Sequence, residues 1–205
     1  MKKNKICIIL CIVIFIAIGG ANISGTGWII YHDGPYRGKV VNADTELPLE
    51  GAAVAAMWRL KTYGGPGGPV GVYCDARETL TDRNGEFTIP KAFCINLWPF
   101  TTMDFPELVI FKPGYLGYPP IGFTPEERSN NLPGFSGSEF RDKGQCDTVR
   151  LGLPKTRRER ESTLHQAESL IHDETQNKLL FLVKLINAEN KNLGIGEWPQ
   201  TGGKK

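Results

Sequence analysis

Histidines and their acidic neighbours are the first residues in this sequence whose types could support chemistry. His165, Glu168 and His172 share one face of a predicted helix, at spacings of three and seven residues. The two histidines are two helical turns apart, beyond easy chelation of one zinc ion, and the His-Glu-x-x-His pattern of zinc peptidases is absent. We therefore expect a polar helix flank at this place, with no metal and no cofactor.

Two further patterns match catalytic or metal-binding motifs only in part. The segment Gly134-Phe135-Ser136-Gly137 departs from the Gly-x-Ser-x-Gly elbow that presents a nucleophilic serine in hydrolases. Asp82, Asn84 and Glu86 alternate as at the start of a calcium loop, but Phe93 occupies the twelfth position, where such a loop requires glutamate. The sequence therefore predicts no catalytic residue.

The alternation of Asp82, Asn84 and Glu86 is better explained by a tight hairpin over residues 81–87. The carboxylate of Asp82 can accept hydrogen bonds from the backbone amides that follow it, and Gly85 can adopt a positive φ without a Cβ penalty. Leu80 and Phe87 flank this turn, and we expect both to be buried on one face of the hairpin.

Three other segments extend this pattern into a small antiparallel β-sandwich. They are Gly38-Lys39-Val40-Val41, Pro48-Leu49-Glu50-Gly51-Ala52-Ala53-Val54 and Lys112-Pro113-Gly114-Tyr115. With the hairpin, they follow the order strand, turn, strand. We expect strands at 36–42, 52–60, 70–80, 86–89, 108–112 and 149–153.

The four segments together resemble the carboxypeptidase regulatory-like domain, a transthyretin-like sandwich that recurs in bacterial secreted and surface proteins. The resemblance covers residues 36–115, with insertions at 63–71 and 94–106. It implies a mainly β fold, a Greek-key transthyretin-like β-sandwich over 36–153 with a long loop at 114–147. In this family the domain is a binding or spacer module, so the resemblance implies no active site.

The strand predicted at 52–60 is apolar on both faces, so we expect it to be central and covered on both sides. One face carries Ala53, Ala55 and Met57, and the other carries Val54, Ala56 and Trp58.

The N-terminal residues have the layout of an export segment. Lys2, Lys3 and Lys5 precede the uninterrupted apolar run Ile6–Ile18, and small residues follow at 19–21. Residues 1–21 are either a cleaved signal peptide or a retained membrane anchor, and both alternatives remain open. In either case we expect the body to be exported, in the periplasm or outside the cell, or anchored in the inner membrane. Membrane contact would run through residues 6–21 if they are not cleaved. Residues 22–35 form a connector, in which Trp28-Ile29-Ile30-Tyr31 is either a first strand or an interfacial anchor.

The period of the apolar residues changes after Pro154, which predicts a helical extension over 154–205. We expect a helix over 156–190, broken or bent near 172–175, and ended by Gly194.

Three cysteines lie outside the apolar run: Cys74, Cys94 and Cys146. Cys74 and Cys94 flank the Asp82 hairpin, which slightly favours a disulfide between them in an oxidising compartment. The alternative, that all three are small buried apolar side chains, remains open.

Aromatic residues cluster among prolines in the second half of the sandwich. They either fill the ends of the sandwich or form a binding rim for a peptide, a glycan or a partner protein. The candidate rim consists of Trp98, Phe100, Phe105, Tyr115, Tyr118 and Phe123.

The net charge of the chain indicates which classes of partner it can bind. The formal net charge is +2, and without the three N-terminal lysines 24 − 3 = 21 basic residues face 22 acidic ones. Such a body has no basic stripe for a nucleic acid. We expect a non-catalytic, exported binding or structural module of the cell envelope. The alternative is a hydrolase that uses residues of the 114–147 loop, which would require two of His32, His165, His172, Cys146 and Asp142 to converge in a pocket.

Overall fold

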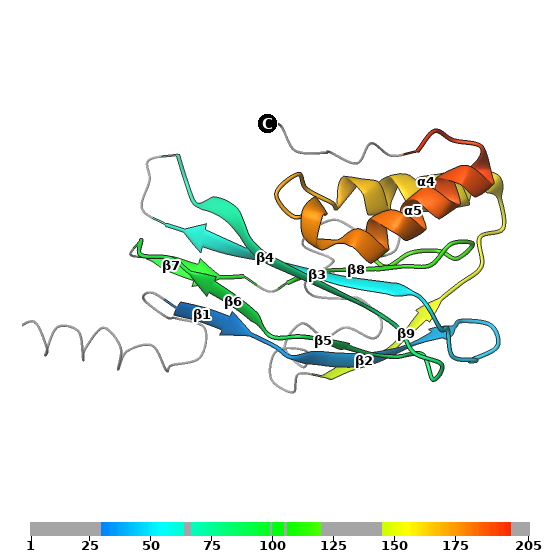
Figure 1. The fold of residues 1–205 in the computed structure, drawn as a ribbon, viewed down its shortest axis with the longest axis horizontal. Helices are drawn as coiled ribbons and strands as arrows, with labels where there is room; N and C mark the ends of the chain where they lie inside the picture. The colour runs from blue at the N-terminus through cyan, green and yellow to red at the C-terminus, as the bar shows by residue number, and fades with distance from the viewer. Residues whose placement is uncertain (1–29, 64–66, 99, 105, 120–144, 198–205) are drawn as a thin grey trace, which may run out of the picture.

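The computed structural model describes residues 30–63, 67–98, 100–104, 106–119 and 145–197, with side chains in the last range described from residue 148. The described part is mainly β (Figure 1). Its strands are β1 (Ile30–Asp33), β2 (Tyr36–Asn42), β3 (Ala53–Thr62), β4 (Val70–Leu80), β5 (Glu86–Ile89), β6 (Ala92–Ile95), β7 (Thr101–Met103), β8 (Glu107–Phe111) and β9 (Gln145–Leu151). The helical segments that follow are α4 (Arg157–Ser169), the 3₁₀ turn η2 (Gln176–Lys178) and α5 (Leu180–Leu193).

The strands form two stacked layers, with the helices over the outer face of one of them (Figure 1). The upper layer has the order β4-β3-β7, and β8 pairs with the other part of β3. The lower layer contains β5-β2-β9 and the two-stranded sheet β1-β6. All of these pairs are antiparallel except β2 with β9, which is parallel, so the expectation of a purely antiparallel body was wrong at this strand.

Strand β3 is the centre of the molecule, and its two faces belong to two separate cores. Its residues from Ala53 to Trp58 are completely buried. Val54, Ala56 and Trp58 pack in the core between the two layers of strands, whereas Ala53, Ala55 and Met57 pack in the core beneath the helices. The prediction of a central strand covered on both sides is confirmed.

The hairpin predicted at 81–87 is present, with one correction. The Asp82 carboxylate accepts hydrogen bonds from the amides of Asn84 and Glu86, both at 2.9 Å. Phe87 is buried as expected, but Leu80 is exposed. The inward position belongs to Thr81 instead, whose hydroxyl accepts from Ala52 N and donates to the Leu49 carbonyl.

The helical extension is broken into two helices, which is one of the two forms expected from the sequence. Helix α4 begins at an N-cap, Thr156, whose hydroxyl accepts from Glu159 N. The interruption predicted at 172–175 spans residues 170–179 and contains η2. Helix α5 ends at Gly194, which has a φ of +69°.

The first turn of α5 is capped from the sheet. No side chain of its own N-cap residue caps the helix. Instead the carboxylate of Glu78 on β4 accepts from the amides of Phe181 and Leu182, at 2.7 and 3.0 Å. A carboxylate at a helix N-terminus satisfies free amides and interacts favourably with the helix dipole, so this contact fixes α5 on β4.

Two short strands, β6 and β7, were not expected from the sequence, and they lie in the segment 94–106 or at its start. β1 lies within the predicted connector 22–35 and overlaps the first strand that was one of two alternatives for residues 28–31. Residues 1–21, for which an export segment is predicted, are outside the described residues. Among the described helices, none has the length and apolar character needed to cross a membrane.

Candidate binding site

A β-bulge in β4 determines where the site forms. Trp58 of β3 pairs with Asp75 and the next residue, Arg59, pairs with Tyr73, so Cys74 is an extra residue in β4. A bulge of this kind bends the strand and changes the direction of the side chains around it. Here Cys74 packs against the core between the layers, while Tyr73 packs on the helix side.

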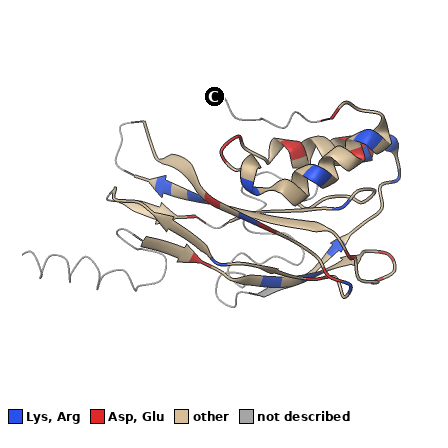
Figure 2. Ribbon diagram, viewed as in Figure 1, with Lys and Arg blue, Asp and Glu red and all other residues tan. Residues whose placement is uncertain are grey.

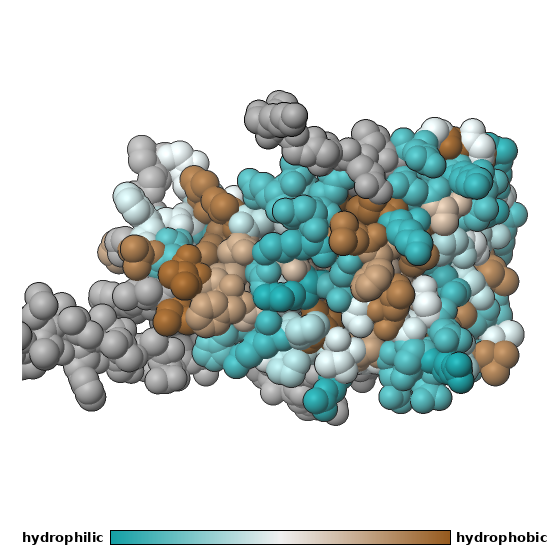
Figure 3. All heavy atoms as spheres, viewed as in Figure 1, coloured by the Kyte–Doolittle hydropathy of each residue, from teal (hydrophilic) through white to brown (hydrophobic). Residues whose placement is uncertain are grey.

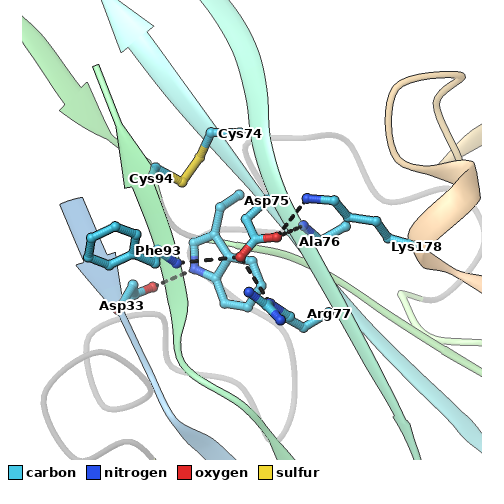
Figure 4. The surroundings of a disulfide bond; sticks show 9 residues. Asp33, Cys74, Asp75, Ala76, Arg77, Phe93, Cys94 and Lys178 are labelled. Carbon is cyan, nitrogen blue, oxygen red and sulfur yellow. Dashed lines mark hydrogen bonds and ion pairs between the residues drawn. A yellow bond between two sulfur atoms is a disulfide. The ribbon is translucent and has the colours of Figure 1, made fainter. Parts of the chain in front are cut away.

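The bulge brings Cys74 of the upper layer to Cys94 on β6 of the lower layer, and the two form a disulfide (Figure 4). Their Cα atoms are 5.7 Å apart. This is the pairing that the flanking positions favoured in the sequence. Since β4 and β6 belong to different sheets, the disulfide joins the two layers at this edge.

Asp75, next to the disulfide, links three elements through its side chain (Figure 4). Its Oδ1 accepts from Lys178 Nζ of η2 and from Ala76 N, both at 2.9 Å. Its Oδ2 accepts from Arg77 Nε at 2.9 Å and from Phe93 N of β6 at 3.4 Å. Burial opposes the charged form, but the hydrogen bonds from Lys178 and Arg77 outweigh it, so the pKa of Asp75 lies below its usual value. Sequence reasoning missed this residue.

A second aspartate, Asp33, holds β1 against the core. Asp33 Oδ2 accepts from the indole nitrogen of Trp58 at 2.8 Å and from the hydroxyl of Tyr36. The Tyr36 and Trp58 rings are stacked, with centroids 6.3 Å apart. These contacts position the β1-β6 sheet, which forms one wall of the site.

An open groove of about 610 Å³ lies between β4 and β6 above the disulfide. Its lining is largely apolar: Leu60, Thr62, Val72, Tyr73, Cys74, Phe93, Cys94, Ile95 and Asn96. Leu60 and the disulfide are its more buried part, whereas Val72, Phe93 and Ile95 are exposed.

The apolar surface continues from the groove onto the β3–β4 and β6–β7 connections. We call the groove and these two connections the disulfide end. Hydrophobic side chains gather there at the left of the view in Figure 3. The most exposed are Leu97 (78%), Trp98 (66%) and Phe100 (78%) on the β6–β7 connection, and Tyr63 and Val70 lie at the β3–β4 connection. Residues 62–74 and 92–103 contain no charged side chain. Figure 2 shows Lys and Arg on the part of β3 that reaches this end, and most other charges on the rest of the sheets and on the helices.

The six aromatic residues of the predicted rim do not form one surface. Trp98 and Phe100 are exposed at the disulfide end, whereas Tyr118 is only 7% exposed and belongs to the core between the layers. Tyr118 is buried because its backbone exchanges two hydrogen bonds with Ile110 of β8, at 2.8 and 3.0 Å. Tyr115 packs against the same core. Phe105 and Phe123 are outside the described residues.

The histidines occupy separate places. His32 lies on β1 in the lower layer, His165 Nδ1 is 3.1 Å from Glu168 on α4, and the ring of His172 stacks on Tyr73. Asp142 and the side chain of Cys146 are outside the described residues, so their convergence with a histidine is untested. Within the described ranges, no group of three His, Cys, Asp or Glu residues could hold a metal ion.

Tyr73 is the centre of a polar cluster beside the groove. Its hydroxyl donates to Glu107 Oε2 at 2.8 Å, and the guanidinium of Arg59 lies 5.1 Å from its ring centroid. Burial, and then the hydrogen bond and charge of Glu107, raise the pKa of Tyr73 far above its usual value. Tyr73 therefore stays protonated near neutral pH and cannot act there as a general base.

Comparisons with known proteins give no family for this chain. No family model matches it, and no curated protein matches it. A 9R-lipoxygenase from Cyanothece PCC8801 is similar over 78% of this chain and 24% of the lipoxygenase chain, with 15% sequence identity and a TM-score of 0.23. The chain thus spans about a quarter of that protein, and a likeness at this TM-score carries no argument about fold or function.

Proposed function

We propose that this protein is an exported, non-catalytic binding or structural module of the cell envelope, which binds its partner through the disulfide end. We further propose that residues 36–153 are a Greek-key transthyretin-like β-sandwich of the carboxypeptidase regulatory-like type. The observation that carries the functional proposal is the extended, uncharged apolar surface over the groove and the β3–β4 and β6–β7 connections. Apolar patches of this kind on soluble domains mark interaction sites.

Two other features support export and binding. Disulfides form and persist in oxidising compartments, and the Cys74–Cys94 bond lies where it stabilises the groove. The walls of the groove are also held by the contacts of Asp75 and Asp33. A site built on rigid strands loses little conformational entropy on binding.

The alternative of a hydrolase remains a prediction. It depends on the 114–147 loop, most of which is outside the described residues, and no contact among the described residues favours it. A hydrolase would need a nucleophile and a base within hydrogen-bonding reach of each other.

The location and the disulfide can be tested together on the full-length chain in cells. Cell fractions are treated with a maleimide of high mass, which shifts each free thiol on a gel, with and without prior reduction. We expect the protein in the periplasmic or membrane fraction, with two thiols that react only after reduction. The variant with both Cys74→Ser and Cys94→Ser is the control and should gain no reactive thiol on reduction. A cytosolic protein whose thiols all react without reduction would contradict the proposal.

Binding is tested in the same cells by a photo-reactive amino acid at position 97 or at position 180. Leu97 and Leu180 are both strongly exposed, at 78% and 66%. Leu180 lies on α5, outside the groove and outside the β3–β4 and β6–β7 connections. We expect adducts, with protein or lipid, from position 97 and not from position 180. Equal yields at the two positions would contradict binding at the disulfide end.

A further inference from the structure

We propose that the disulfide end docks on the surface of a lipid bilayer, with Leu97, Trp98 and Phe100 inserted at the boundary between head groups and acyl chains. This inference rests on the proposed function, because it requires export and names a lipid surface as the partner. It differs from the predicted membrane contact of residues 6–21, since it assigns lipid contact to the folded body.

The β6–β7 connection presents these three side chains as a protruding apolar tip. Each is more than half exposed, and Phe100 has a φ of +59°, in the left-handed region that bulky residues rarely adopt. Burial of its side chain in the protein does not compensate this backbone strain, because 78% of Phe100 is exposed. Strained residues that persist on a surface are associated with binding sites.

The described residues of the two connections at this end carry no charge: 67–74, 92–98 and 100–103. Lys61 of β3, which pairs with Gly71 and Thr102, lies beside them. A single charged side chain at membrane depth costs several kcal/mol, so a surface that enters the head-group region must lack charges at its tip. Tryptophan, tyrosine and phenylalanine are the residues that favour this region. The tip therefore has the composition of a bilayer contact.

The connection to the predicted export segment ends at the same place. Ile30, the first residue of β1, pairs with Ile95 of β6, two positions before Leu97. Eleven residues, 19–29, separate Ile30 from the apolar run Ile6–Ile18. An extended chain of that length reaches at most about 40 Å. If the run lies in a bilayer, Ile30 thus lies within about 40 Å of the end of that run.

The shape of the tip favours lipid over a protein partner. A specific protein interface of ordinary size buries about 800 Å² on each partner and has a polar rim with paired hydrogen bonds. The tip instead consists of three apolar side chains on the β6–β7 connection, which need no complementary surface to enter a bilayer. Lys61, whose Nζ is 6.0 Å from the ring centroid of Tyr63, adds a cation beside the tip that can meet lipid phosphates.

The test uses the full-length chain inserted into vesicles of phosphatidylethanolamine and phosphatidylglycerol. Some vesicles also contain a lipid with a spin label close to the head group, which quenches nearby tryptophan fluorescence. The chain has four tryptophans, so the signal of Trp98 is the difference between the wild-type protein and Trp98→Phe. We expect this difference signal to be quenched by the spin-labelled lipid and protected from iodide in the water.

Paired variants test whether the tip drives docking. We expect Leu97→Asp to weaken docking by at least about ten-fold, because it removes a large apolar side chain and adds a charge at the boundary. Leu180→Asp makes the same change at a comparably exposed leucine on α5 and should leave the Trp98 signal unchanged. Loss of quenching in both variants would overturn the proposal.

The outcomes also separate this inference from the proposed function. If the protein is exported and position 97 forms adducts with protein while Trp98 stays accessible to iodide in vesicles, the lipid proposal fails and the binding module stands. If the protein is cytosolic, the proposed function fails first, and docking in vesicles no longer describes its role. Adducts with lipid at position 97, together with quenching of Trp98, support both.

Discussion

Replacement of Asp75 by asparagine tests how the two layers and the helices are held together. The side chain of Asp75 is only 4% exposed and accepts four hydrogen bonds, two of them from the cations of Arg77 and Lys178. In Asp75→Asn the volume is kept, but one of the two oxygens becomes an NH₂ group. That group faces two donors wherever it is placed, and the negative charge is lost.

The magnitude follows from these contacts. Hydrogen bonds to charged groups each contribute about 1.5–3 kcal/mol, and loss of one partner of a fully buried ion pair costs about 3–5 kcal/mol. The side chains of Arg77 and Lys178 are 44% and 46% exposed and can return to water. We therefore expect a lower loss, about 2 kcal/mol of the free energy of unfolding.

The assay is urea unfolding followed by tryptophan fluorescence, with the disulfide intact. Asp82→Asn is the matched control, because the exposed Asp82 carboxylate accepts only backbone amides, which asparagine can also do. We expect the control to change stability by less than about 0.5 kcal/mol. An Asp75→Asn protein as stable as this control would refute the reasoning.

The pH dependence gives a second test of the same residue. The pKa of Asp75 is lower in the folded protein than in the unfolded chain, where it is about 4. The carboxylate therefore contributes its full stabilisation above that value and loses it as the pH falls through the folded pKa. Asparagine does not titrate, so the stability difference between wild type and Asp75→Asn should decrease below about pH 4. A difference of constant size between about pH 7 and about pH 3 would contradict the ion pairs.

Four further variants test other parts of the fold. Replacing Cys74 and Cys94 by alanine should cost about 3 kcal/mol for a loop of 20 residues, measured by urea unfolding; a loss below about 1 kcal/mol would contradict a formed bond. Gly85→Ala places a Cβ 2.3 Å from the Val40 carbonyl at a φ of +73° and should cost about 3 kcal/mol or more. Gly114→Ala, at +81° with open space around it, should cost about 1 kcal/mol, and equal losses would refute the close approach. Glu78→Ala should cost about 1 kcal/mol by removing the cap of α5; unchanged stability would show that this cap contributes nothing.

The strands with the densest local signals could be predicted from the sequence. The expected strands at 36–42, 70–80 and 86–89 coincide with β2, β4 and β5, and the two faces of β3 are as expected. In each case the signal, an alternation of apolar residues or a turn with aspartate and glycine, lies within a few consecutive residues and can be recognised without knowing the fold. The break between α4 and α5 was expected for the same reason, although its length was not.

The short strands of the site could not be predicted, because distant contacts define them. β6 has four residues, pairs with β1 and carries Cys94 of the disulfide. β7 has three residues, which pair with the end of β3. The contacts of Asp75 depend on a bulge and on partners 18 and 103 residues away. Nothing in the composition distinguishes exposed Leu97 from buried Leu60, since only the fold decides which apolar side chains reach the surface.

The parallel pairing of β2 with β9 has a consequence for how this chain reaches its native state. Val40 pairs with Val149, which follows it by 149 − 40 = 109 residues, and one face of β3 is covered by helical residues between Leu164 and Leu193. Pairings between such distant residues raise the contact order and slow folding. A ribosome must therefore make the chain as far as Leu151 before the core between the layers is complete, and as far as Leu193 before the core beneath the helices is complete. Until then β2 has β5 but not β9 beside it, and one apolar face of β3 is uncovered.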